Sequence, residues 1–324
     1  MSTHKDQGAQ VQITTEGGHT ITASAMAMTT NVPLHQASIV LKEAFYRTYC
    51  IAVAAPKGTF PDMSLYDNSD PYIYVRKTSH PDPSKEYLIT GGEDHKVGQE
   101  TPEGYRSHFE KLVKWTKAHY PAVEDKADYE WSGHIVEPND YLAYIGRDTG
   151  LEKNVYVSSG DSGNGLTHGV IAGKLIADLI TGNANPDWAA LYSPSRKPKP
   201  RTIPESVSEN VNQNLQFKRY AAVDVSDIED IPKCEGAVMH GAWKDLKTPV
   251  AVYKDGQGEV RKFSAICPHM KGVVTWNSVE KTWDCGVHGS RFEGKTGRCV
   301  MGPSNRGLKN KDEAAAEAQQ GTSG

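Results

Sequence analysis

The sequence predicts an α+β region with a mixed sheet, followed by a small all-β domain. Short strand-like segments dominate residues 11–157, and only two long helical segments accompany them. After about residue 220 the pattern changes to short strands joined by tight turns. The length of 324 residues fits about two domains. We therefore divide the chain into a first region at 1–192, a linker at 193–219, a second domain at 220–308 and a tail at 309–324.

The first region opens with a predicted β-hairpin. Residues 11–30 alternate apolar and polar side chains around Gly17-Gly18, a dipeptide typical of tight hairpin turns. One helix is predicted at 102–119, with Thr101 as its N-cap and Pro102 as its first residue, and another at 167–180, ending at Gly182. Further strands are predicted at 49–54, 71–75, 87–91, 129–135 and 155–157.

The linker at 193–219 differs in composition from both flanking regions. Its prolines, Pro194, Pro198, Pro200 and Pro204, alternate with Lys and Arg, and a polar stretch follows, which is typical of a connector. A basic patch that binds a partner is the alternative. In the second domain we predict strands at 237–239, 250–253 and 260–266. The Lys/Glu/Ala/Gln-rich tail is predicted to be disordered.

Composition excludes several classes of protein. The 36 basic and 40 acidic residues give a net charge of −4, which argues against nucleic-acid binding. The apolar runs are too short to span a bilayer, and Met1 to Gln10 lacks the apolar core of a signal peptide. Five cysteines, an odd number, do not make a disulfide scaffold, and we expect Cys50, Cys234 and Cys299 to be buried. We expect a cytoplasmic protein without nucleic-acid or membrane partners.

Two short motifs contain residues that bind metals. Cys267-Pro-His269 and Cys285-Gly-Val-His288 are separated by fifteen residues. Two ligand sets are plausible: one zinc ion bound by all four residues, or a Rieske [2Fe–2S] cluster with two Cys on one iron and two His on the other. Each motif supplies one thiolate and one imidazole, which favours the cluster, because common zinc fingers pair Cys with Cys and His with His. A structural zinc site remains the alternative.

The residues around these motifs, CPHMKG and CGVHGSRFEGKTGRCVMGPSN, closely resemble the Rieske family. The resemblance implies that Ser290 bonds a cluster sulfur and that Pro303 belongs to a loop covering the cluster. High-potential members have a disulfide where this chain has Gly272 and Val287, and a hydrogen-bonding tyrosine where it has Phe292. Fewer hydrogen bonds to sulfur predict a potential in the lower part of the Rieske range of about −150 to +300 mV.

A glycine-rich turn lies between the predicted strand at 155–157 and the second predicted helix. Its glycines allow a ligand to approach the backbone, and the helix N-terminus offers amide donors, which suits the pyrimidine edge of a flavin. A purely structural turn is the alternative. The predicted cofactor contacts are Gly160, Asp161, Gly163, Asn164, Gly165, Leu166 and Thr167.

The first region resembles FAD-dependent oxidoreductases of the D-amino-acid oxidase superfamily. The resemblance lies in the stretch from NVYVSSGDSGNGLTHG to YSPSRKP, in LITGGEDHKVGQ and in YEWSGHIVEPNDYLAYIGRD. The chain is most similar to the branch with a C-terminal Rieske domain, from about residue 11 to 308. The resemblance implies FAD, a small amine or amino-acid-like substrate, and hydride transfer that needs no protein base, so we assign no catalytic residue. The start of the chain shows no G-x-G-x-x-G of a nucleotide-binding βαβ unit. We therefore expect a fragment that binds FAD only if that unit is supplied.

For several residues, and for the function of the protein, the sequence leaves more than one interpretation open. His95 is either a flavin or substrate contact or a polar loop residue, Glu93 and Asp94 are paired carboxylates or a solvated turn, and His168 faces the flavin or a packing surface. One candidate function is a redox enzyme whose cluster relays single electrons between a flavin and an unidentified electron-transfer partner. Another is an electron-carrier module with a flavin-free first region. The third is a zinc-stabilised interaction protein.

Overall fold

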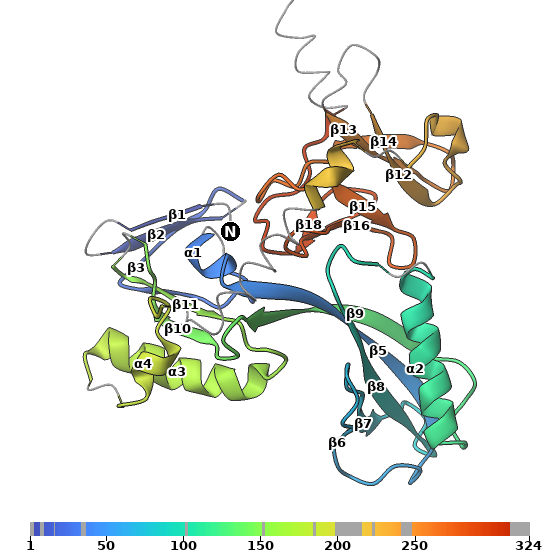
Figure 1. Cartoon of the computed structure of the whole chain (residues 1–324), viewed down its shortest axis with the longest axis horizontal. Helices are drawn as coiled ribbons and strands as arrows, with labels where there is room; N and C mark the ends of the chain where they lie inside the picture. The colour runs from blue at the N-terminus through green and yellow to red at the C-terminus, as the bar shows by residue number, and fades with distance from the viewer. Residues whose placement is uncertain are drawn as a thin grey trace, which may run out of the picture. The chain divides into compact units, whose positions relative to one another are not determined.

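The computed structural model describes residues 3–6, 10–15, 17–33, 37–100, 103–150, 153–183, 186–197, 216–221, 224–240 and 248–311. The chain divides into two compact units, one formed by Tyr46–Ile135 and the other by Met1–Phe45 with Val136–Gly324. Most of the predicted linker, 198–215, and most of the predicted tail, 312–324, lie outside the described residues. The predicted fold class is confirmed, because mixed and antiparallel sheets with few helices precede an all-β region (Figure 1).

The Tyr46–Ile135 unit is built around a sheet of order β6-β7-β8-β5-β9, in which β7, β8 and β5 pair antiparallel. The long apolar run of β5 is buried on both faces, and α2 packs against β8 (Figure 1). Thr116 of α2 donates a hydrogen bond to Thr90 of β8, with 2.8 Å between the hydroxyl oxygens. The elements are β5 Glu43–Pro56, β6 Leu65–Tyr66, β7 Tyr74–Ser79, β8 Lys85–Lys96, α2 Tyr105–His119 and β9 Tyr129–Pro138.

Helix α2 begins at Tyr105, three residues later than predicted. Gly104 precedes it with a φ of 73°, a left-handed backbone conformation that cannot belong to the helix and that glycine adopts readily. Thr101 and Pro102, the predicted cap and first helical residue, lie outside the described residues. The predicted apolar face is confirmed at Phe109 and Leu112, which are buried.

In the other unit, the residues of the first region form two small sheets. The predicted hairpin is confirmed by antiparallel β2 and β3, which β1 extends, while β11 pairs parallel with β4 and antiparallel with β10. Helix α3 covers β10 and β11 and ends at Gly182, as predicted, with a φ of 74° (Figure 1). The elements are β1 Thr3–Asp6, β2 Val11–Thr14, β3 Thr20–Ala23, β4 Met26–Met28, α1 Ala37–Val40, β10 Tyr144–Arg147, β11 Val155–Ser159, α3 Gly165–Thr181 and α4 Ala189–Tyr192.

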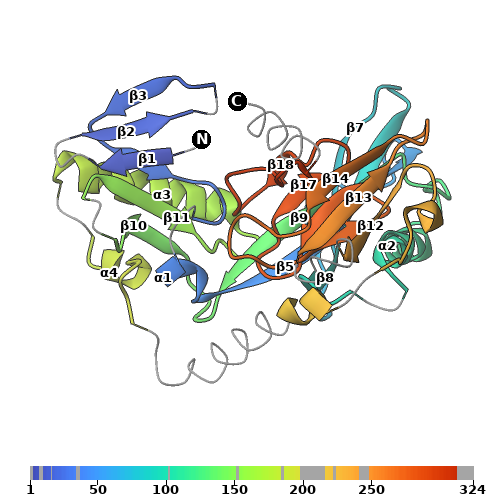
Figure 2. The same ribbon diagram turned by 90° about the horizontal axis from the view of Figure 1, so that it is seen from above.

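The C-terminal residues form two antiparallel sheets, β12-β13-β14 (Figure 2) and β15-β16-β17-β18. Their core is centred on the fully buried aromatic rings of Trp283, Phe292 and Phe263. The elements are η2 Gln216–Ala221, η3 Ile228–Asp230, β12 Glu235–His240, β13 Pro249–Lys254, β14 Val260–Ser264, β15 Val274–Asn277, β16 Thr282–Cys285, β17 Arg291–Glu293 and β18 Cys299–Met301.

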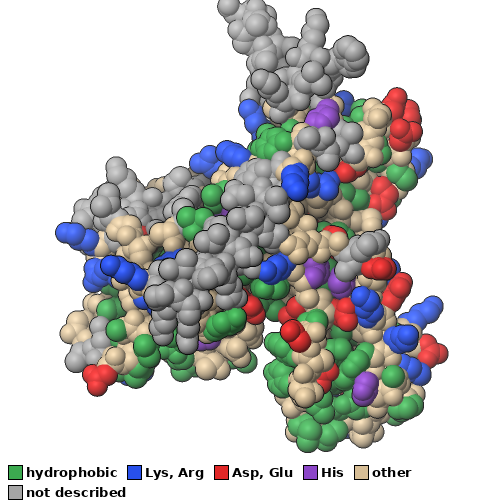
Figure 3. Space-filling view, in the orientation of Figure 1, with side chains coloured by type: hydrophobic (Ala, Val, Ile, Leu, Met, Phe, Trp, Pro, Cys, Tyr) green, Lys and Arg blue, Asp and Glu red, His purple; other side chains and the backbone are tan. Residues whose placement is uncertain are grey.

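Apolar side chains gather on the surface over β6–β8 (Figure 3), where Met63, Tyr66 and Tyr72 are exposed.

Among the helices of the described residues, none is both long enough and apolar enough to cross a membrane. The expected cytoplasmic location stays a prediction.

Candidate metal centre and flavin-facing turn

Two loops with the same backbone hydrogen bonds carry the four predicted ligands. In the first loop the Cys267 amide donates to Gly272 O at 2.8 Å, and the Lys271 amide donates to Cys267 O at 3.1 Å. In the second loop the Cys285 amide donates to Ser290 O at 2.8 Å, and Gly289 donates to Cys285 O at 3.0 Å. Because β15 and β16 pair antiparallel, with Val274 opposite Cys285, the two loops lie side by side.

The structure brings the four side chains together. The thiols of Cys267 and Cys285 are hydrogen-bonded to each other, and the ring centroids of His269 and His288 lie 5.0 Å apart. Cys267, Cys285 and His288 are buried, whereas His269 is only half-buried. The loops therefore present sulfur next to sulfur and imidazole next to imidazole, with one imidazole nearer the surface.

Backbone amides compensate the charge that the thiols would carry as metal ligands. The amides of His269 and Met270 donate to the Cys267 sulfur, and those of Val287 and His288 donate to the Cys285 sulfur. The hydrogen bond from Cys285, together with these amides and the Ser290 hydroxyl, lowers the pKa of Cys267.

The donor set and its arrangement fit a Rieske [2Fe–2S] cluster, which takes two thiolates on one iron and two imidazoles on the other. Gly272 keeps the loops close: a Cβ there would lie 2.4 Å from Val287 Cγ2 and 3.1 Å from the Cys285 sulfur. Tetrahedral zinc also accepts two thiolates and two imidazoles. Pairing of like donors favours the cluster, and the ligand assignment stays a prediction.

Ser290 lies beside the first predicted cysteine ligand, while the roles predicted for Ser290 and Pro303 at the cluster stay predictions. The Ser290 hydroxyl bonds the Cys267 sulfur, and its oxygen accepts the Ser304 amide at 3.0 Å. Pro303, next to Ser304 in the chain, is buried. One hydroxyl thus links the proline-containing loop to a predicted ligand.

The glycine-rich turn shows the backbone freedom that the sequence predicts. Gly160, Ser162 and Gly163 have φ values of 71°, 50° and 76°, and α3 begins at Gly165, two residues before the predicted start. A Cβ on Gly160 would lie 2.4 Å from Pro138 Cγ, so this position requires glycine. Nδ1 of His168 lies 3.1 Å from the Asp161 carbonyl oxygen, and the same residue lines the cavity beside the turn, so both alternatives for His168 stay open.

A cavity of about 540 Å³ lies beside this turn, within the usual range of ligand pockets. Of the predicted cofactor contacts, Gly160, Asp161 and Gly165 line it, together with Asn31 and Ser159. The other predicted contacts, Gly163, Asn164, Leu166 and Thr167, are exposed, Leu166 by 93%. Backbone groups of these lining residues would be able to hold the polar edge of a flavin ring system, and the flavin contacts stay a prediction.

Sequence reasoning missed one buried acidic residue beside this cavity. Glu43, at the start of β5, is fully buried, and its Oε1 lies 2.6 Å from the Ser159 hydroxyl. Burial raises the pKa of Glu43 to about 8. The sequence shows only a single carboxylate directly before the apolar run of β5. The periodicity of apolar residues does not show whether such a carboxylate is buried or lies at an exposed strand end.

The remaining singled-out residues lie elsewhere. Cys50 is buried as expected and Cys299 half-buried, but the expectation for Cys234 was wrong: it is exposed, in a turn with a φ of 61°. His95 lies at the end of β8 rather than in a loop, half-buried against Tyr49. Glu93 lies 3.4 Å from the His108 ring and 3.5 Å from Lys111 Nζ.

Two family models match the chain, one over each part of it. Residues 2–179 match the family described as FAD dependent oxidoreductase, and residues 221–312 match the Rieske [2Fe-2S] domain. The chain therefore belongs to the FAD dependent oxidoreductase family and carries a C-terminal Rieske [2Fe-2S] domain.

The similar proteins include whole-chain and local matches. YhfW of Bacillus subtilis (strain 168), provisionally named a Rieske 2Fe-2S iron-sulfur protein, is 26% identical over 94% of this chain and 58% of its own length. Gamma-glutamylputrescine oxidoreductase of Escherichia coli (strain K12) is 39% identical over 18% of this chain and 13% of its own. Glycine oxidase from Geobacillus kaustophilus matches with a TM-score of 0.46 and 16% identity, covering 61% of this chain and 52% of its own. This chain thus spans little more than half the length of YhfW and of the glycine oxidase.

Proposed function

We propose that this chain is part of an oxidoreductase. In it a flavin oxidises an amine or amino-acid-like substrate, and a Rieske cluster relays single electrons to or from that flavin. The convergence of two thiols and two imidazoles on two matching loops carries the proposal. Membership of the FAD dependent oxidoreductase family supports the flavin part. When bound, the cluster supplies one-electron transfer and the flavin supplies two-electron oxidation of a C–N bond.

The chain's own residues have defined roles in this proposal. Cys267 and Cys285 bind as thiolates whose charge the loop amides compensate, and His269 and His288 bind as imidazoles. Half-buried His269 puts one ligand ring near the surface, where an electron-transfer partner is able to approach. Gly160, Asp161 and Gly165 offer backbone groups to the flavin from the cavity wall.

The substrate proposal rests on the family and on the names of relatives. Gamma-glutamylputrescine oxidoreductase and glycine oxidase are named for an amine and an amino acid. We assign no catalytic side chain, because the hydride leaves the carbon attached to the nitrogen and goes to the flavin while a C=N bond forms, which needs no protein base.

An electron carrier whose first region binds no flavin is the second candidate. The observation that favours it is the exposed start of α3, where Leu166 is 93% exposed and a Cβ on Gly169 or Gly173 would meet only open space. In this case the cluster residues keep their roles and the cavity beside the glycine turn holds no flavin.

The test is a cofactor analysis of the full chain purified anaerobically. Iron and acid-labile sulfide in equal amounts, with a Rieske EPR signal, are expected, and FAD released on heating selects the enzyme over the carrier. The double variant Cys267→Ser/Cys285→Ser should lose iron and sulfide, whereas Cys234→Ser, at an exposed cysteine outside both loops, should keep them. Zinc without sulfide in the wild-type protein would contradict both redox functions.

A further inference from the structure

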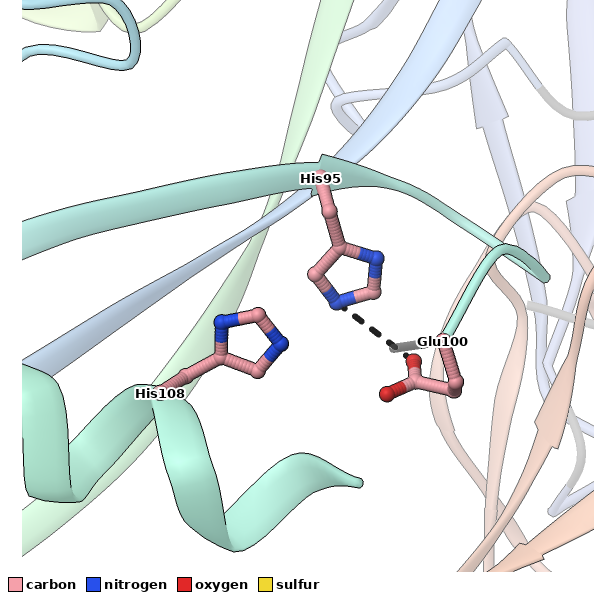
Figure 4. Close-up of side chains that lie close together, drawn as sticks. All are labelled: His95, Glu100 and His108. Atoms are coloured by element: carbon pink, nitrogen blue, oxygen red, sulfur yellow. Dashed lines mark ion pairs between the residues drawn. The ribbon is translucent and has the colours of Figure 1, made fainter. Parts of the chain in front are cut away.

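Three side chains converge at the end of β8, within the Tyr46–Ile135 unit. His95 lies at the end of β8, Glu100 just after the turn that follows, and His108 in the first turn of α2. One donor atom from each lies within 4.8 Å of the others, and His95 Nε2 is 3.4 Å from Glu100 Oε1 (Figure 4). The chain reverses over four residues here, because the Gln99 amide donates to Lys96 O at 3.1 Å and Gly98 has a φ of 75°.

The histidine rings are held by contacts that leave their Nε2 atoms facing this space. Nδ1 of His95 lies 2.9 Å from the Lys96 carbonyl oxygen, so it carries the proton and Nε2 carries the lone pair. Nδ1 of His108 lies 3.4 Å from Glu93 Oε2, which favours the same tautomer. Metal-binding histidines usually donate their other ring N–H to a carbonyl or a carboxylate in this way.

His108 supplies an independent sign of a missing ligand. Its side chain is only 3% exposed, and within the described part of the chain its Nε2 has no hydrogen-bond partner. Figure 4 shows this nitrogen pointing toward His95 and Glu100. A buried nitrogen lone pair without a partner costs free energy, unless a ligand satisfies it.

The donor set selects the class of ligand. Two imidazoles and one carboxylate bind divalent first-row transition metals such as zinc or iron(II), leaving positions open for water or another molecule. Ligands of a tetrahedral ion with bonds of about 2.0–2.1 Å lie about 3.3 Å apart, close to the separation of His95 Nε2 and Glu100 Oε1. The wider spread of the three donors, 4.8 Å, closes with ring movements on the order of 1 Å.

Burial also keeps both rings in the metal-binding form. Desolvation lowers the pKa of His95 and of His108 to about 4, so both imidazoles are neutral near pH 7. The ring of Tyr49 stacks on His108 at 4.4 Å and 10°, which fixes the plane of that imidazole.

We propose that His95, Glu100 and His108 form a second metal site, which binds one divalent transition-metal ion independently of the Rieske cluster. The Tyr49 hydroxyl, 2.9 Å from His95 Nε2, occupies that lone pair in the metal-free protein and must release it when the metal binds. Glu93 positions His108 through Nδ1 rather than touching the metal.

The test is zinc binding to the full chain with its iron–sulfur cluster in place. The proteins compared by titration calorimetry are the wild type, His108→Gln, Glu100→Gln and, as the matched control, His119→Ala, which removes an exposed histidine from the same helix. The wild type and His119→Ala should bind one more equivalent than His108→Gln. Glu100→Gln should bind at least about a hundredfold more weakly, because even outer-shell changes cost 10–100-fold.

X-ray absorption at the zinc edge separates this site from the cluster loops. Nitrogen and oxygen neighbours at about 2.0–2.1 Å, without sulfur at about 2.3 Å, are expected. Glu93→Gln should weaken binding about tenfold while keeping that spectrum. Equal zinc stoichiometry and affinity in the wild type and in folded His108→Gln would overturn the proposal, and so would a sulfur shell. As a control for folding, each variant should have the same circular dichroism spectrum and melting temperature as His119→Ala.

Discussion

Gly272 and Val287 lie directly against each other across the two cluster loops. A Cβ built on Gly272 would be 2.4 Å from Val287 Cγ2 and 3.4 Å from Val287 Cβ. These are the two positions where high-potential members of the Rieske family, which this domain resembles, have a disulfide. The backbone therefore keeps the geometry of a cross-link whose cysteines are absent, and the contact between a glycine and a valine replaces it.

The double variant Gly272→Cys/Val287→Cys should form that disulfide. Cβ atoms of disulfides lie about 3.5–4.5 Å apart, close to the separation at this pair. The bond would close a loop of about fifteen residues, which predicts about 3 kcal/mol of added stability. Denaturant unfolding of the cluster-loaded protein with and without a reductant measures it. If mass spectrometry shows the bond and the two unfolding midpoints coincide, the loops are strained by the cross-link and this prediction is wrong.

Replacing one predicted sulfur ligand should remove the cluster and unfold its domain. Cys285→Ser leaves three ligands, and cluster binding and folding are coupled in small domains of this kind. The expected result is loss of the visible absorbance and of protease resistance in residues 221–312. His288→Ala should behave in the same way, and Cys234→Ser serves as the control because that cysteine is exposed. Retained cluster absorbance in Cys285→Ser would contradict the ligand assignment.

The Ser290 hydroxyl should raise the reduction potential of the cluster. It bonds the Cys267 sulfur, and hydrogen bonds to sulfur stabilise the reduced state. We expect a wild-type potential in the lower part of the range of about −150 to +300 mV, and a lower one for Ser290→Ala. A redox titration followed by EPR measures both values. A wild-type potential above about +200 mV, or an unchanged potential in Ser290→Ala, would count against this account.

The sequence predicted those parts of the fold that local patterns determine. The alternation around Gly17-Gly18 predicted a hairpin, and the structure contains it as β2 and β3. The glycine after α3 predicted its end, because a left-handed residue there needs no Cβ. The cluster loops could be recognised because both cysteines and both histidines fall within two short motifs.

Features that depend on contacts between distant residues were not predictable in this way. His95 and His108 come together only because the chain turns back between β8 and α2, and neither the spacing nor the residue types form a known metal motif. The prediction that α2 starts at Pro102 was wrong because Gly104 adopts a left-handed conformation, which the local sequence pattern did not reveal. Glu43 reads as an ordinary strand end, and only the folded structure shows that it is buried against Ser159.

Glu43 and Ser159 form a pair whose hydrogen count favours a protonated carboxyl. The Ser159 oxygen lies 2.6 Å from Glu43 Oε1 and 2.8 Å from Asn31 O, and one hydroxyl hydrogen cannot serve both acceptors at once. When Glu43 is protonated, it donates to Ser159, which then donates to Asn31 O. Burial, which raises the pKa of Glu43 to about 8, acts in the same direction.

We therefore expect the unfolding free energy to fall as the pH rises from about 4.5 to about 8. In this window the native state holds a proton on Glu43 that the unfolded state has lost, so raising the pH favours unfolding. At 1.36 kcal/mol for each pKa unit, the loss amounts to a few kcal/mol. Glu43→Gln keeps a neutral donor toward Ser159 and should be more stable than the wild type at pH 9, with little difference at pH 4.5. Urea unfolding of both proteins at pH 4.5, 7 and 9 measures the effect. A stability difference between them that does not change with pH would show that the pKa of Glu43 is not raised in the folded protein.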